Sequence, residues 1–131
     1  MSTREKVEEI LAAEGEEAEV VKDVLRALAL FHGVLWESEV AEDIMKMRDY
    51  RVPYVPTADK VRRAIEILSA EGLVKVEERV RGSLTSPSTY RDRLLKLVDM
   101  WGVREALLRD PVYLRAYSAR MRALKDAVGP D

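Results

Sequence analysis

The stretch TADKVRRAIEILSAEGLVKV, residues 57–76, decides the fold of this chain. Its apolar residues recur at i, i+3, i+4 and i+7, which places them on one face of a helix: Val61, Ala64, Ile65 and Leu68. Thr57 has a side chain that caps a first turn, and Gly72 suits the left-handed conformation in which helices end. From residue 73 apolar and charged residues alternate, as in a strand. The stretch therefore predicts a capped helix, a glycine stop and a β-strand.

The segments on either side add further predicted elements. Upstream, apolar spacing and capping residues predict a short strand over 34–36 and helices over 2–13, 16–31 and 38–47. Downstream they predict a strand over 73–80, a turn-rich loop over 81–88, and helices over 89–101, 103–108 and from 110 onward. Asp110 and Pro111 are the expected cap and first residue of the last helix. The predicted fold class is mainly α with a minor β part.

Residues 61–68 followed by Glu71-Gly72-Leu73-Val74 resemble the recognition helix and first wing strand of winged helix-turn-helix DNA-binding domains. The resemblance covers Glu16 to Tyr90 and implies a winged-helix domain with a small β-wing and extra C-terminal helices. It is similar to dimeric regulators of the PadR and MarR type, of archaeal or archaeal-virus origin. Two features depart from the family. The connection Arg48–Pro56 is long for the turn before a recognition helix, and the return strand of the wing is weakly marked because residues from Thr89 onward favour a helix.

The resemblance implies a DNA-binding site on the predicted helix and wing. Its residues are Thr57, Ala58, Lys60, Arg62 and Arg63 on the helix, and Arg79, Arg81 and Arg91 on the wing. Arginine can clamp the O6 and N7 acceptors of guanine, while the chain lacks Asn and Gln and so cannot make the usual amide clamp on adenine. The alternative is a solvated helix face paired with Asp59 and Glu66, and ion pairs between the wing strands.

The C-terminal residues carry an aromatic and apolar stripe, which predicts a homodimer seam. It comprises Trp101, Tyr113, Tyr117, Met121 and Leu124. Such a stripe usually belongs to a core, but the winged body before it is already a complete unit. The predicted organisation is an N-terminal helical extension over 1–15, a winged-helix domain over 16–93 and dimerisation helices over 94–131.

The charge is distributed unevenly along the chain. Residues 1–43 hold 12 acidic and 4 basic side chains, net −8, whereas residues 44–131 hold 18 basic and 12 acidic, net +6. A localised basic footprint of this kind favours a regulator that binds double-stranded DNA. The acidic pI of 5.6 and the acidic N-terminal third support the alternative, a winged-helix protein–protein interaction module without DNA binding.

Several function classes lack a signal. Without Cys and with His32 as the single histidine, neither a metal site nor a cofactor is expected. No phosphate loop or nucleophile motif is evident, so the chain is not expected to be an enzyme. No apolar run approaches a membrane span and the first residues lack a signal-peptide pattern, which predicts a cytoplasmic protein. The absence of Cys, Asn and Gln suggests a hyperthermophilic source, or a compositional bias of the genome.

Overall fold

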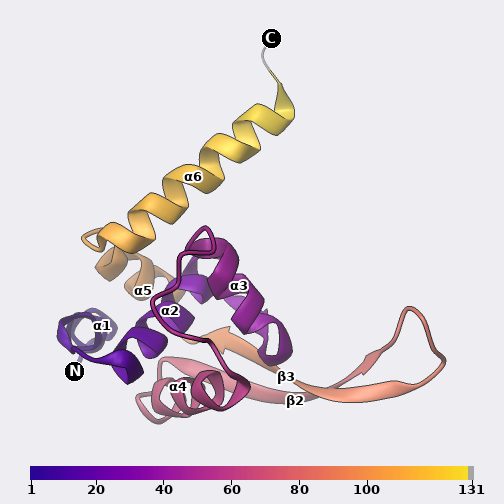
Figure 1. Ribbon diagram of the computed structural model, residues 1–131. Helices are drawn as coiled ribbons and strands as arrows, with labels where there is room; N and C mark the ends of the chain where they lie inside the picture. Colours follow the sequence, from indigo (N-terminus) through magenta and orange to yellow (C-terminus); the bar gives the residue numbers. More distant parts are fainter. Residues whose placement is uncertain (130–131) are drawn as a thin grey trace.

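The computed structural model describes residues 1–129 as a mainly helical α+β fold with a small antiparallel sheet (Figure 1). In chain order the elements are α1 (Thr3–Ala12), α2 (Glu16–Leu30), β1 (Val34–Trp36), the 3-10 turn η1 (Glu37–Glu39), α3 (Val40–Met47), α4 (Ala58–Ala70), β2 (Val74–Gly82), β3 (Thr89–Leu97), α5 (Met100–Leu107) and α6 (Pro111–Val128). The strand order in the sheet is β1-β3-β2.

The capped helix predicted from residues 57–76 is confirmed as α4. The Thr57 side chain accepts a hydrogen bond from the Lys60 N–H at 3.2 Å. The four predicted apolar residues are the buried residues of the helix, and α4 packs with them against α2. Gly72 has a φ of +76°, and the chain then enters β2. Local capping and apolar spacing were sufficient here because every residue involved lies within one segment.

The helix predicted over 89–101 is wrong, since residues Thr89–Leu97 form β3. This strand pairs antiparallel with β2 over its whole length, from Val74 opposite Leu97 to Gly82 opposite Thr89. It also pairs with β1 and buries Leu95 completely at the centre of the sheet. The helical spacing of its leucines did not decide the structure, because pairing with two neighbouring strands favours the extended conformation. No local pattern in the sequence predicts that pairing. The following helix accordingly starts earlier than predicted, at Met100.

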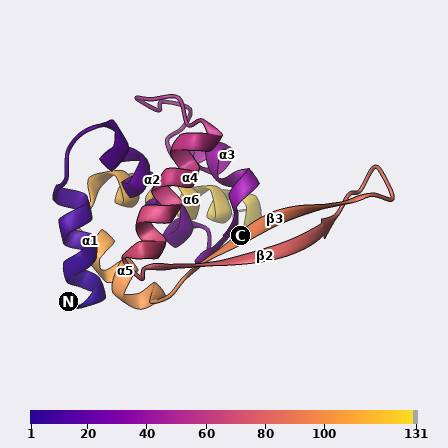
Figure 2. The same cartoon turned by 90° about the horizontal axis from the view of Figure 1, so that it is seen from below.

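The core is built around α2, which is buried along most of its length. Helices α1, α3, α4 and α5 surround it, and the sheet closes one side (Figure 1). The hairpin formed by β2 and β3 then extends well beyond the helices, as Figure 2 shows from below. The sheet is therefore anchored at one end and free at the other.

The three predicted segments share this one core. Val7 of α1 is fully buried beside α5, although residues 1–15 were predicted as an extension. The same apolar cluster contains Leu25, Leu107 and Tyr113. The predicted boundary between residues 93 and 94 falls within β3. The N-terminal and C-terminal helices thus pack against the central body.

Helix α6 leaves the body part-way along its length. Tyr113 and Ala116 are its buried residues, and from Tyr117 onward none of its described side chains is buried. Figure 1 shows the C-terminal half rising away from the other helices. Among the described residues no helix is both long enough and apolar enough to cross a membrane.

Candidate nucleic-acid interface

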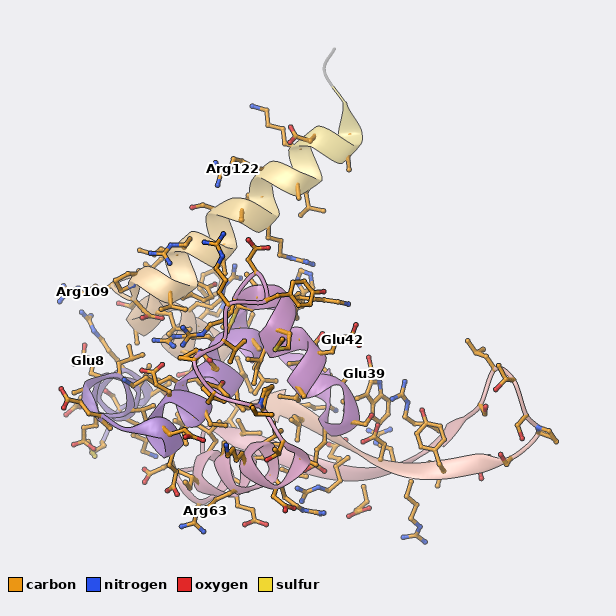
Figure 3. All side chains as sticks on the ribbon, in the orientation of Figure 1. Glu8, Glu39, Glu42, Arg63, Arg109 and Arg122 are labelled. Atoms are coloured by element: carbon orange, nitrogen blue, oxygen red, sulfur yellow. The ribbon has the colours of Figure 1, made fainter. Side chains whose placement is uncertain are left out.

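Helix α4 and the β2–β3 hairpin lie on one face of the molecule, the face turned toward the viewer in Figure 2. Of the basic residues predicted on the hairpin, Arg91 lies on one face of the two-stranded ribbon and Arg79 and Arg81 lie on the other, because Arg91 is paired with Val80 and Arg81 with Tyr90. Figure 3 shows Arg63 projecting from α4 away from the body. The arrangement places a helix and a β-ribbon side by side on one face.

Each of the three basic side chains of α4 has a carboxylate nearby. Lys60 lies 2.5 Å from Glu16, and Arg63 lies 2.9 Å from Glu17. Both partners come from the first turn of α2 rather than from α4 itself, where Asp59 and Glu66 were the expected partners. The Arg63 side chain is 67% exposed and that of Glu17 60%. An ion pair this exposed contributes about 0–1 kcal/mol, so it can open when a phosphate approaches.

Arg62 lies farther from its nearest carboxylate than the other two basic residues of α4 do. Its nearest carboxylate oxygen, on Glu37, lies 4.0 Å away, and its side chain is 56% exposed. Glu37 is already held by two hydrogen bonds of 2.8 Å from Arg93. These bonds lower the pKa of Glu37 despite its partial burial. Arg62 therefore keeps most of its guanidinium N–H groups available for an external acceptor.

Arg81 is an anchor of the hairpin rather than a free cation. Its guanidinium donates to Glu39 at 2.8 Å and to Asp92 at 3.0 Å, and it lies 4.2 Å from the ring centroid of Trp36. Burial by itself would raise the pKa of Asp92, but hydrogen bonds from Ser38 and Arg81 lower it overall. The phosphate contact of Arg81 stays a prediction, and Arg81 can make it only after releasing Glu39 and Asp92.

The other two wing arginines differ from each other. Arg79 is bound to Glu77 at 2.5 Å, and hydrogen bonds from Arg79 and Lys96 lower the pKa of Glu77 to about 2. Arg91 is exposed and has no ion-pair partner among residues 1–129. Of the predicted wing contacts, Arg91 is the one whose charge is uncompensated.

The long connection before α4 is fixed by a buried carboxylate that the sequence analysis missed. Asp23 of α2 accepts hydrogen bonds from Arg48 at 2.9 Å and from Tyr54 at 2.7 Å. Burial raises the pKa of the Tyr54 hydroxyl, and its bond to Asp23 raises it further. The charged residues Lys22, Asp23 and Arg26 within the buried stretch of α2 are the signal in the sequence for this role. The connection thereby sets where α4 begins.

The predicted dimer seam is exposed except for one member. The exposed members are Trp101 at 82%, Leu124 at 50%, Met121 at 47% and Tyr117 at 36%. Tyr113 is 2% exposed and belongs to the core of the single chain, so its inclusion in the seam was wrong. Tyr113 faces inward because it lies in the first turn of α6, where the helix still contacts α2.

Two further observations bear on identity. Within residues 1–129 no cluster of three or more His, Cys, Asp or Glu side chains is suitable for a metal ion. Comparison of the chain with protein-family models, with curated proteins and with solved structures returns no match in any of the three.

Proposed function

We propose that this chain is a winged-helix protein that binds double-stranded DNA as a homodimer and regulates transcription. In this proposal α2, α3 and α4 are the three helices of the domain, and the β2–β3 hairpin is its wing. The order of the elements and the antiparallel order β1-β3-β2 support it. The observation that carries it is the exposed pair Arg62 and Arg63 on α4, beside a projecting hairpin that presents Arg91.

The proposed contacts follow from the geometry of B-form DNA. Helix α4 has the width to enter a major groove, where Arg62 and Arg63 meet guanine or phosphate. The capped N-terminus at Thr57 and Ala58 directs free N–H groups toward a phosphate. The hairpin lies along the flanking backbone with Arg91. For two copies joined through α6 to read two half-sites, their α4 helices must lie about 34 Å apart, one helical turn of DNA.

The decisive experiment measures binding to a random-sequence duplex by fluorescence anisotropy at several salt concentrations. We expect affinity to fall steeply between about 50 mM and about 200 mM salt, because phosphate contacts release counterions. The double variant Arg62→Ala/Arg63→Ala should lose binding without a lower thermal midpoint, since both side chains are exposed.

The matched control is Arg109→Ala/Arg122→Ala. It removes the same charge from exposed positions near and on α6, away from α4 (Figure 3). Equal loss in both double variants would mean attraction to overall charge rather than a defined interface. Unchanged binding by the Arg62/Arg63 variant would remove α4 from the site.

A second candidate function is a protein-interaction module without DNA binding. It is favoured by the pairing of Lys60 with Glu16 and of Arg63 with Glu17, which neutralises much of the α4 surface. The formal net charge of −2 points the same way. Absence of duplex binding even at low salt would replace the first proposal with this one.

A further inference from the structure

A groove of about 570 Å³ lies between α6 and the ends of α2 and α3, away from the α4 face. Its lining residues come from the end of α2, the end of α3, the connection after α3, and α6. Figure 1 shows α6 on the side of the body opposite α4. Its apolar floor includes Phe31 at the end of α2 and Met47 at the end of α3. The volume falls within the range of protein binding sites. Neither the proposed DNA face nor the predicted dimer stripe makes use of it.

The α6 wall of the groove is shaped for another helix. It is formed by small side chains spaced four, three and four residues apart, namely Val112, Ala116, Ala119 and Ala123. This spacing keeps the small residues on one seam over three turns. Small residues allow a neighbouring helix to approach at the short end of the usual 8–10 Å interaxial range. The wall is long and straight, so an elongated occupant fits it better than a compact one.

The rim of the groove is strongly basic. Arg51 and Arg115 line it and have no ion-pair partner within residues 1–129. Arg120 lies 5.0 Å from the Phe31 ring centroid, at the edge of the apolar floor. Asp49 is the single carboxylate among the lining residues. The complementary occupant therefore carries acidic side chains on either side of an apolar stripe.

Both walls are held at the base of the groove before anything binds. Arg48, on the loop side, is held by Asp23 and by Glu19, each at 2.9 Å. On the other side Arg26 donates a hydrogen bond of 2.6 Å to Asp110, the cap of α6. A preformed groove loses little conformational entropy on binding, which raises its affinity for a matching partner.

We propose that this groove docks an acidic amphipathic helix of a partner protein. A second copy of this chain does not fit, because the exposed apolar stripe of its α6 is flanked by Arg120 and Lys125 and would meet the basic rim. The N-terminal helix α1 is acidic, but it already buries Val7 against the body. The proposal is independent of DNA binding, since none of the residues lining the groove belongs to α4 or to the β2–β3 hairpin.

The test uses a fluorescein-labelled helical peptide of about 18 residues, with leucine at the heptad a and d positions and glutamate at e and g. A matched peptide carries lysine in place of each glutamate. We expect the glutamate peptide to bind the full chain at least about tenfold more tightly. Backbone amide shifts in NMR spectra should change at Phe31, Met47 and Ala119.

The variant Arg51→Glu/Arg115→Glu should weaken glutamate-peptide binding by about tenfold or more. Lys125→Glu is the control, because Lys125 is exposed and lies on the side of α6 opposite the seam of Ala116, Ala119 and Ala123. Its effect should stay below about twofold.

Four results would overturn the proposal. They are no binding of the glutamate peptide, equal binding of the lysine peptide, equal weakening by Lys125→Glu, and shift changes outside the groove. If Arg51→Glu/Arg115→Glu instead abolishes duplex DNA binding, the groove binds nucleic acid. If it abolishes self-association, the groove binds a second copy of the chain. Either result rules out the partner helix as the occupant. Because Arg62→Ala/Arg63→Ala leaves the groove intact, failure of the DNA proposal is measured separately.

Discussion

Arg26 holds Asp110 through two hydrogen bonds, of 2.6 Å and 3.0 Å, although 84 positions separate them in the chain. Both side chains are buried. Asp110 also accepts the Tyr113 N–H at 3.1 Å, so the same carboxylate caps α6 and fixes it to α2. Arg26 reaches Asp23 as well, at 2.9 Å, and Asp23 positions the connection before α4. One buried charge network therefore sets the placement of two separate elements.

Replacing Asp110 with Ala should destabilise the protein strongly. The change leaves the buried Arg26 without half of its compensation and removes the cap of α6, so we expect a loss of about 3–5 kcal/mol in the free energy of unfolding. Urea denaturation followed by circular dichroism measures it. Arg109→Ala, an exposed neighbour, should cost about 0.5 kcal/mol or less. A loss below about 1 kcal/mol for Asp110→Ala would show that this network does not hold α6 in place.

Acid should weaken the attachment of the hairpin to the body through Asp92. The pKa of Asp92 is lower in the folded chain than in the unfolded chain. Its contribution to stability is therefore complete above the unfolded pKa of about 3.9 and is lost as pH falls through the lower folded pKa. Thermal midpoints measured from about pH 7 down to about pH 2 should stay level and then fall in the acid range.

Ser38→Ala provides the matched variant for this pH series. It removes the 2.6 Å hydrogen bond from the Ser38 hydroxyl to Asp92, so it should raise the folded pKa and cost about 1.5–3 kcal/mol at neutral pH. Its difference from the parent chain should shrink as Asp92 becomes protonated. A difference that stays constant down to the lowest pH would assign the effect to packing instead.

Removing the acidic partners of the α4 cations should strengthen DNA binding. In Glu16→Gln/Glu17→Gln the side chains of Lys60 and Arg63 no longer have their carboxylates, and the face becomes more positive. We expect affinity for a duplex to rise by about threefold to tenfold with a steeper salt dependence, measured by anisotropy. Glu8→Gln/Glu9→Gln makes the same charge change on α1 and should raise affinity much less. Equal gains in DNA affinity from both double variants would indicate a long-range effect of net charge rather than a local effect at α4.

Charge placed on the α6 stripe should separate the proposed dimer. Met121→Glu and Leu124→Glu alter exposed side chains, so each should change folding stability by only about 0.5 kcal/mol. Analytical ultracentrifugation should show the mass falling from that of two chains to that of one. Ser118→Glu, which lies off the stripe, should leave the mass unchanged. A parent chain that sediments as a monomer at all concentrations would contradict the dimer, and DNA binding would then have to be explained by one copy.

The sequence predicted the helix that carries part of the candidate site, and it missed the charged partners of that helix for a consistent reason. The helix carrying Arg62 and Arg63, its cap and its buried face were all available from residues within the single segment 57–72. The carboxylates that face these cations could not be predicted in this way. Glu16 and Glu17 lie more than 40 positions away and contact the cations only because α2 packs on α4. Arg81 likewise became an anchor because Glu39 and Trp36 fold against it.

The sequence by itself determined the amphipathic helices and their ends, as α4 and the Asp110–Pro111 start of α6 show, because capping and apolar periodicity act within a few residues. Only the tertiary structure decided that Thr89–Leu97 is a strand, that Tyr113 is buried and that a basic groove lies beside α6. Strand pairing, burial and buried ion pairs draw their free energy from partners distant in the chain. A secondary-structure preference inferred from neighbouring residues is outweighed by these long-range interactions once the distant partners are in place.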